Sequence, residues 1–312
     1  MINQDLVIIE NAVAEKSSET ANLIQDWINH CDVSPLTQKS YDSAAKSFLA
    51  FLRENNLKLS EQSIINYREY LKQHFSTSTA RLYFSICKTF CRWLAKRVGV
   101  ADFATDIKNV KLDNSVHARD PLSIEEIATV INNISNLRDK CIVALMACCG
   151  LRTIEVVRLD CGDIEKRRGK YFLRIWGKAR AGKVDSVCLP AELKQLIDEY
   201  LKSRGKVSAA EPLFVSASRR NKNSRLQTQS ISRLAKRAMK AVGLNSRRLV
   251  AHSLRHSFAN NALSAGVDIR QVSKAMRHKS QAVTEVYLHD ADLLNNPAAE
   301  VVTRNLFSFV KG

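Results

Sequence analysis

The sequence lacks the features that would place it outside the cell or in a membrane. Its eight cysteines include no Cys-x-x-Cys pair, and Met1–Glu10 has neither the basic start nor the long apolar core of a signal peptide. The longest apolar run, residues 141–151, is too short to cross a bilayer. We therefore expect a cytoplasmic protein with reduced core cysteines, without a disulfide framework or a zinc site.

Acidic residues are scarce, and their scarcity is uneven. The 312 residues carry a net charge of +17. Residues 201–250 hold thirteen Lys and Arg against one acid, and residues 51–100 hold nine against three, whereas residues 1–50 are net negative. Two basic zones favour a polyanion partner, with nucleic acid as the first candidate. Solvated helix faces are the plain alternative, and a membrane surface is disfavoured because the basic helix lacks a large aromatic face.

The length favours two domains. Residues 1–20 are predicted to be an arm and residues 21–105 a bundle of about four helices, which start near Asn22, Pro35, Ser60 and Ser76 or Thr77 and end at Gly99. Residues 106–119 are predicted to be a linker. The second domain covers residues 120–312, so the predicted fold class is mainly α with a small β-hairpin sheet.

Local patterns place the elements of the second domain. Ser123 and Glu126 form a capping box, and an apolar helix over 137–149 is expected to stop at Gly150. Residues 171–177 and 184–190 are predicted strands, joined by a basic loop over 178–183. Helical patterns follow at 191–203 and 229–242. In the latter, four cations are expected to stay free: Arg233, Lys236, Arg237 and Lys240.

Six polar side chains could together cleave a phosphodiester without a metal or a cofactor. They are Arg152, Lys178, His252, Arg255, His278 and Tyr287. A tyrosine nucleophile must lose its proton, because its usual pKa is about 10. Two arginines suit the charge that builds on the non-bridging oxygens, and a lysine can protonate the leaving oxygen. Histidines can orient the phosphate or help to move the tyrosine proton.

Each of these residues alone has a simpler interpretation. Arg152 could form a salt bridge with Glu155 or Asp160, and Glu155 is expected to support Arg152 rather than react. His252 and His256 have the i, i+4 spacing of a zinc helix, but no Glu follows His252 as a metalloprotease would require. We therefore expect no metal.

The order of these elements resembles the tyrosine recombinase (phage integrase) family. Gly-Leu-Arg-x-x-Glu at 150–155 is followed by a Gly-Lys hairpin, His-x-Leu-Arg-His at 252–256, a later His278 and Tyr287. The resemblance covers about residues 20–312. It implies a two-domain, C-shaped clamp around DNA, with an N-terminal core-binding bundle and a mixed α/β catalytic domain. It implies that Arg152 and Arg255 clamp the scissile phosphate and that Lys178 is the acid that protonates the leaving oxygen. It also implies that His252 and His278 complete the pocket and that Tyr287 forms a 3′-phosphotyrosyl bond.

The same resemblance implies a homotetramer that pairs two duplexes bearing inverted repeats and recombines them through a Holliday junction. No further N-terminal domain is evident, which favours the simple Xer-like or transposon type of enzyme. The C-terminal segment, with Leu306, Phe307 and Phe309, is expected either to dock on a neighbouring protomer or to pack on its own domain. A type IB topoisomerase and a catalytically silent DNA-binding regulator are the alternative functions.

Two positions depart from the family pattern. Ala179 follows Lys178 where the family usually has Gly, so Lys183 is a second, weaker candidate for the acid. Arg277 precedes His278 where the family usually has Gly. It is expected either to contact the DNA backbone or only to fill space.

Overall fold

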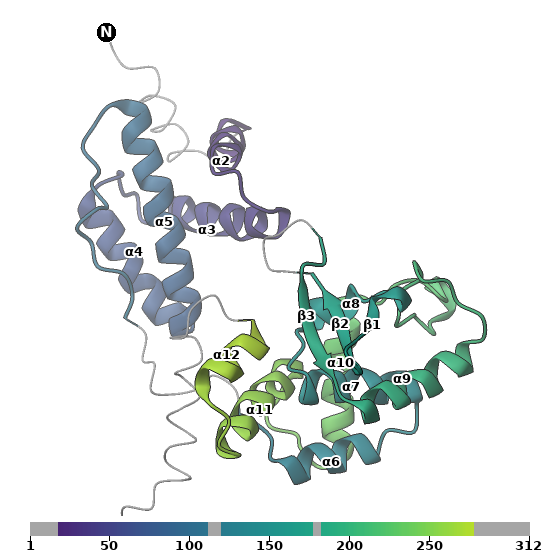
Figure 1. The fold of residues 1–312 in the computed structure, drawn as a ribbon. Coiled ribbons are helices and arrows are strands. Elements are labelled where there is room, and N and C mark those ends of the chain that lie inside the picture. Colours follow the sequence, from purple (N-terminus) through teal and green to yellow (C-terminus); the bar gives the residue numbers. More distant parts are fainter. Residues whose placement is uncertain (1–17, 112–119, 177–181, 278–312) are drawn as a thin grey trace, which may run out of the picture. The chain divides into compact units, whose positions relative to one another are not determined.

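The computed structural model describes residues 18–111, 120–176 and 182–277 (Figure 1). The chain divides into two compact units, Met1–Ser115 and Val116–Gly312. The division falls within the predicted linker, residues 106–119. None of the helices in the described ranges is both long enough and apolar enough to span a membrane. Each unit is described by itself below.

The first unit is a helical bundle. Its described helices are α2 (Ser18–His30), α3 (Pro35–Glu54), α4 (Glu61–His74) and α5 (Thr77–Val98). The side chains of Ser34, Ser60 and Ser76 cap the N-termini of α3, α4 and α5, as the sequence predicts for the latter two. Gly99 ends α5 in the left-handed conformation, with φ 73°. Helix α2 begins at Ser18, earlier than the predicted Asn22.

The start of the predicted linker packs on this bundle. Ala104, Ile107 and Val110 are buried in the core of the first unit. Cations of α5 hold the segment in place: Arg81 donates to the carbonyl of Val110, and Lys88 to that of Ile107. Part of the basic zone over 51–100 is thus used inside the fold, and residues 106–110 do not form a free linker.

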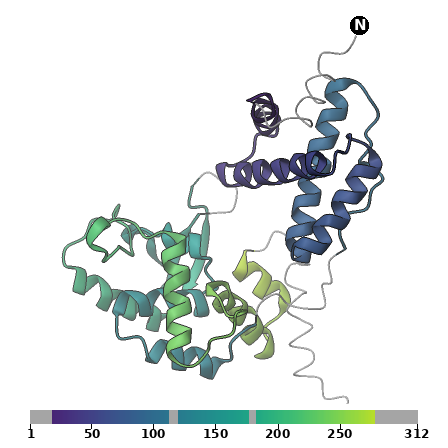
Figure 2. The same cartoon turned by 180° about the vertical axis from the view of Figure 1, so that it is seen from behind.

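The second unit is a mixed α/β domain. Its described elements are α6 (Ile124–Asn132), α7 (Leu137–Cys148), α8 (Thr153–Val157), η1 (Cys161–Asp163), β1 (Ile164–Arg167), β2 (Lys170–Ile175), β3 (Asp185–Leu189), α9 (Ala191–Arg204), η2 (Arg219–Asn221), α10 (Thr228–Ala241), α11 (Ala251–Ser264) and α12 (Ile269–Met276). Helix α7 is buried over residues 141–147 and contacts α9 and α11. Seen from behind, α10 (green) runs along the near side of this unit (Figure 2). The predicted capping box at Ser123 and Glu126 is present.

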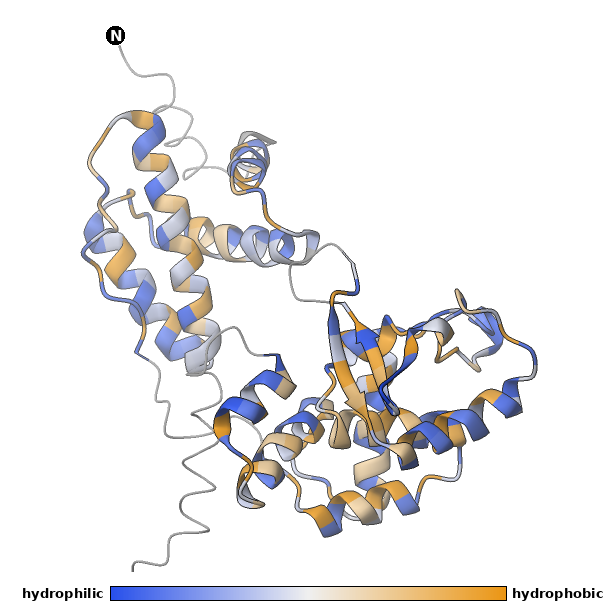
Figure 3. Ribbon diagram, in the orientation of Figure 1, coloured by the Kyte–Doolittle hydropathy of each residue, from blue (hydrophilic) through white to orange (hydrophobic). Residues whose placement is uncertain are grey.

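The sheet has the order β1-β2-β3 and is antiparallel throughout. Strands β2 and β3 match the predicted hairpin, with Leu173 opposite Val187 and both residues buried in the core. The hydrophobic residues of the strands are coloured orange in Figure 3. Strand β1 was not predicted, because only its first residue is apolar. A two-residue turn at Arg168 and Gly169, with φ 48° and 80°, joins it to β2.

The basic face of α10 differs in one residue from the prediction. Arg233, Arg237 and Lys240 are exposed. Lys236 instead donates hydrogen bonds to the carbonyls of Ser246 and Leu249, at 2.5 and 2.9 Å. The expectation that Lys236 stays free was wrong, because the chain after α10 folds back over it.

Candidate active site

The site is built on the turn between α7 and α8. Gly150 has φ +58°, and a Cβ added to it would lie 2.7 Å from Cδ1 of Phe258 on α11. Only glycine therefore lets this turn approach α11 so closely. The Gly150 carbonyl accepts hydrogen bonds from Arg255 on α11 and, at 3.2 Å, from Arg277 after α12. The turn thus gathers arginines from two separate elements.

Glu155 holds Arg152 as the sequence predicts. Its Oε1 atom accepts from Nη1 of Arg152 at 2.7 Å, and its Oε2 atom accepts from the Arg152 backbone N–H at 2.8 Å. The carboxylate therefore fixes both the main chain and the guanidinium of the same residue. The Arg152 side chain stays about a quarter exposed, whereas the Glu155 side chain is 6% exposed. Asp160, the other predicted partner, belongs to a different network.

Arg277 also binds Glu155, in a way the sequence did not predict. It lies at the C-terminal end of α12 in the left-handed conformation, with φ 56°. Its Nη2 atom lies 2.7 Å from Glu155 Oε2, and its side chain is 9% exposed. Arg277 therefore forms an ion pair within the site, a role that neither of the two expectations, contact with DNA or space filling, had included. The only sign of this role in the sequence was an arginine where the family usually has Gly.

Arg255 is the most deeply buried member. Its side chain is 1% exposed, with Nη1 lying 3.9 Å from Glu155 Oε2. The same nitrogen donates to the Gly150 carbonyl, and Nη2 donates to the Met276 carbonyl at 2.5 Å. His252 and His256 lie one turn apart on the same helix, half-buried, with their rings edge to face and 4.9 Å between centroids.

These four residues, Arg152, Glu155, Arg255 and Arg277, are called the arginine cluster below. Burial alone would raise the pKa of Glu155, but Arg277, the Arg152 backbone N–H and the guanidiniums of Arg152 and Arg255 together lower it. Burial lowers the pKa of Arg277, and Glu155 opposes that shift. Glu155 thus lies among three guanidiniums, and Asp185 also acts on the charge of Arg277. Guanidiniums gathered in this way can bind an anion such as a phosphate.

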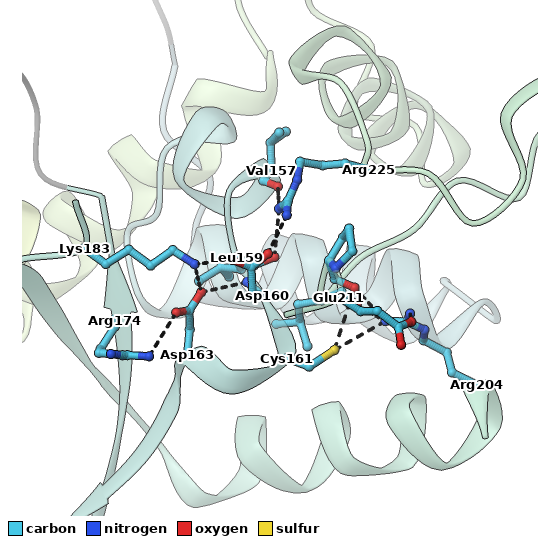
Figure 4. A network of polar contacts seen from close by, with 12 residues as sticks. Val157, Leu159, Asp160, Cys161, Asp163, Arg174, Lys183, Arg204, Glu211 and Arg225 are labelled. Carbon is cyan, nitrogen blue, oxygen red and sulfur yellow. Dashed lines mark hydrogen bonds and ion pairs between the residues drawn. The ribbon is translucent and has the colours of Figure 1, made fainter. Parts of the chain in front are cut away.

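A second polar cluster lies a few residues further along the chain (Figure 4). Lys183 Nζ lies 2.6 Å from Asp160 Oδ2 and also bonds Asp163, while Arg225 bonds the other oxygen of Asp160. We call Asp160, Asp163, Lys183 and Arg225 the Lys183 network. Arg174 also ion-pairs with Asp163, at 3.6 Å, so the two carboxylates face three cations. The Lys183 ammonium is thus held by two carboxylates where β3 begins.

Three predicted catalytic residues, Lys178, His278 and Tyr287, lie outside the described residues, as does the C-terminal segment over 301–309. Of the predicted set, the structure brings together Arg152 and Arg255, with His252 on the helix of the latter. Among the described residues, no three His, Cys, Asp or Glu side chains are grouped so that they could hold a metal ion.

Comparison with known proteins agrees with this arrangement. The sequence model of the phage integrase family matches residues 120–293, which is more than half of the chain and includes the arginine cluster. The chain belongs to the phage integrase family. It is a tyrosine recombinase, an enzyme of DNA recombination, as its sequence motifs predict.

Its relatives include recombinases of the Xer type. Tyrosine recombinase XerA of Pyrococcus horikoshii is 27% identical over 287 residues, which cover 92% of this chain and 90% of the relative. Tyrosine recombinase XerC of Pelobacter propionicus is 27% identical over 269 residues, covering 83% and 86%.

Solved structures share the fold. The XerH recombinase in a post-cleavage complex with palindromic difH DNA matches with a TM-score of 0.71 and 20% identity, covering 86% of this chain and 80% of that one. A lambda integrase tetramer bound to a Holliday junction matches with a TM-score of 0.62 and 16% identity, covering 84% and 78%. The mainly helical fold with a small sheet is therefore confirmed.

Proposed function

We propose that this recombinase is site-specific and cuts each DNA strand through a covalent 3′-phosphotyrosyl bond to Tyr287. The observation that carries the proposal is that the arginine cluster holds two arginines in fixed orientations. Arg152 and Arg255 are oriented by Glu155 and by backbone carbonyls before any substrate arrives. Such preorganised charge is what stabilises a five-coordinate phosphorus as its non-bridging oxygens become more negative.

The reaction proposed is a balanced transesterification. The Tyr287 phenol loses its proton and its oxygen attacks the scissile phosphorus. The bond from phosphorus to the 5′ oxygen breaks, and that oxygen takes a proton from Lys178. His252 and His278 orient the phosphate or help to move the tyrosine proton. A 5′-hydroxyl then attacks the phosphotyrosine and restores the phosphodiester, so the step needs no ATP and no metal.

We further propose that four protomers act on two duplexes. Each duplex would carry inverted half-sites, and the strands would exchange in two rounds through a Holliday junction. The XerH complex contains a palindromic site and the lambda integrase tetramer contains a Holliday junction, and both share this fold. The apolar residues of the C-terminal segment, Leu306, Phe307 and Phe309, are proposed to dock on a neighbouring protomer.

Covalent trapping tests the chemistry. The wild-type protein and the Tyr287→Phe variant would be mixed, in EDTA, with nicked duplexes taken from the DNA that flanks the gene, and run on a denaturing gel. A shifted band that requires Tyr287 is expected. A band that survives in Tyr287→Phe would remove this tyrosine from its role. Tight DNA binding without any band would favour a silent regulator.

A second assay separates recombination from topoisomerase activity. Two labelled duplexes that carry the cleaved site would be incubated together, alongside a supercoiled plasmid that bears one site. Joined products with exchanged flanks support the proposal. Relaxation of the plasmid without exchange between duplexes would favour a type IB topoisomerase.

A further inference from the structure

One carboxylate joins two arginines of the arginine cluster. Oε1 of Glu155 accepts from Nη1 of Arg152, while Oε2 accepts from the Arg152 backbone N–H at 2.8 Å and from Nη2 of Arg277 at 2.7 Å. Guanidiniums only donate hydrogen bonds, so a favourable link between Arg277 and Arg152 has to pass through an acceptor that lies between them. Glu155 is that acceptor, and both of its oxygens are held.

We propose that Arg277 is a positioning residue that fixes the orientation of Arg152 through Glu155. The bond from Arg277 holds the carboxylate at Oε2, which keeps Oε1 directed at the Arg152 guanidinium. Arg255 attracts the same Oε2 atom from 3.9 Å, so it adds to this hold without replacing the shorter bond. This inference rests on the proposed function, because it takes Arg152 as a contact to the scissile phosphate.

The charge of Arg277 supports the same role. The Glu155 side chain is 6% exposed, and burial raises the pKa of its carboxyl group. Of the guanidinium charges that lower this pKa again, that of Arg277 acts most strongly, ahead of those of Arg152 and Arg255. An ionised carboxylate accepts at both oxygens, as the two bonds from Arg152 require. Arg277 therefore stabilises the form of Glu155 that Arg152 uses.

The backbone of Arg277 also indicates a role for its side chain. The residue adopts φ 56°, which is costly for a residue with a Cβ and natural for glycine. A turn alone would be better made by glycine. The buried side chain, however, makes an ion pair with Glu155 and hydrogen bonds to two carbonyls, those of Gly150 and Ala275. These contacts offset the unfavourable conformation and join the end of α12 to α8.

The test is a double-mutant cycle between Arg277→Gly and Arg152→Ala, measured as single-turnover cleavage of the nicked duplex. Glycine suits the left-handed backbone, so Arg277→Gly removes the side chain without straining the turn. In the wild-type background this change is expected to slow cleavage about tenfold, the loss typical of one charged hydrogen bond. In the Arg152→Ala background it is expected to cost less than about twofold, since no guanidinium remains to be oriented. Arg277→Lys, which keeps the charge, is expected to recover part of the rate.

Arg168→Gly is the matched control. Arg168 is exposed, has φ 48° and lies in the β1–β2 turn, so the change removes one charge and relieves one left-handed residue outside the cluster. It is expected to leave cleavage unchanged. Urea unfolding of each variant would identify any loss of cleavage caused by misfolding.

A measurement on the free protein separates this inference from the proposed function. The nitrogen NMR signals of the Arg152 guanidinium, assigned by their absence from Arg152→Ala, report how fast that group rotates. Arg277→Gly is expected to speed the rotation, because the carboxylate that holds the guanidinium is itself held less firmly. A wild type that cuts no DNA would refute the proposed reaction, and the rotation would still decide the inference. Unchanged rotation in Arg277→Gly, unchanged cleavage, or equal losses of cleavage in both backgrounds would overturn it.

Discussion

Glu155 of the arginine cluster and Asp160 of the Lys183 network lie five residues apart in the sequence, yet the charges around them are arranged differently. In the cluster, the Glu155 carboxylate lies among three guanidiniums, whereas in the network the Lys183 ammonium lies between the carboxylates of Asp160 and Asp163. The network ties together the start of β3, η1 and the chain near Arg225. The cluster instead holds several guanidiniums close together, which suits it to an anion. Which charge lies at the centre therefore distinguishes a structural group of ion pairs from a candidate anion site.

Removing Arg152 should produce the largest difference in cleavage between the arginine cluster and the Lys183 network. Arg152→Ala takes away a preorganised contact to the phosphate and is expected to raise the cleavage barrier by about 3–4 kcal/mol, or two to three powers of ten in rate. Arg225→Ala, the corresponding change in the Lys183 network, should lower stability and change cleavage by less than about threefold. Single-turnover cleavage of the nicked duplex measures both. Similar losses of cleavage rate in the two variants would mean that the Lys183 network contributes to cleavage as much as the arginine cluster does.

Removing Lys183 should lower the unfolding free energy more directly than the rate of cleavage. Lys183→Met takes the closer of two cations from the buried Asp163, whose remaining partner Arg174 lies 3.6 Å away. Breaking such a buried pair is expected to cost about 3 kcal/mol of unfolding free energy, measured in urea. Lys183→Arg keeps the charge and should restore most of the stability.

Cleavage by Lys183→Arg also decides between the two candidate acids. If Lys183 is structural, this variant should cut at close to the wild-type rate while Lys178→Arg does not. A large loss of cleavage in a stable Lys183→Arg protein would instead make Lys183 the acid that protonates the 5′ oxygen.

The pH dependence of stability should report on Glu155. Its pKa is lowered in the folded protein, so its contribution is fully present above the unfolded value of about 4.3 and is lost as pH falls through the lower folded pKa. Protonation would leave three guanidiniums with no carboxylate among them. The unfolding free energy of Glu155→Gln is therefore expected to fall less steeply below pH 4.3 than that of the wild type. Parallel curves would assign the acid sensitivity to other carboxylates, such as Asp160.

The smallest expected effect extends the comparison to α10. Neutralising the exposed Arg233, Arg237 and Lys240 together should weaken DNA binding and reduce the slope of log affinity against log salt by about 2–3, if each meets a phosphate. Lys236→Gln, whose cation is used by two backbone carbonyls, should lower stability and leave that slope unchanged. DNA-binding titrations at several salt concentrations distinguish the triple variant from Lys236→Gln. An unchanged slope in the triple variant would mean that this face of α10 contacts solvent and not DNA.

Local signals in the sequence predicted local structure well. Ser60, Ser76 and Ser123 begin helices and Gly150 ends one, because caps depend on a few neighbouring residues. Strand β1 was missed because three of its four residues are charged, although the Arg-Gly pair after it is a turn signal.

Contacts between distant segments could not be predicted in this way. Lys183 meets Asp160 across 23 residues, and Arg277 meets Glu155 across 122. No periodic pattern encodes either pair. The family resemblance supplied Arg152 and Arg255, but Arg277 departs from that pattern, so its ion pair became evident only in three dimensions.

The docking of residues 104–110 on the first unit bears on how chimeras of such recombinases should be joined. A junction placed soon after Gly99, where the last helix of the bundle ends, would exchange the helices without residues 104–110, which pack on them. The apolar surface that binds Ala104, Ile107 and Val110 would then meet the corresponding segment of another protein, and Arg81 and Lys88 would lose their own carbonyl partners. A junction after Lys111 would instead transfer the helices together with this segment.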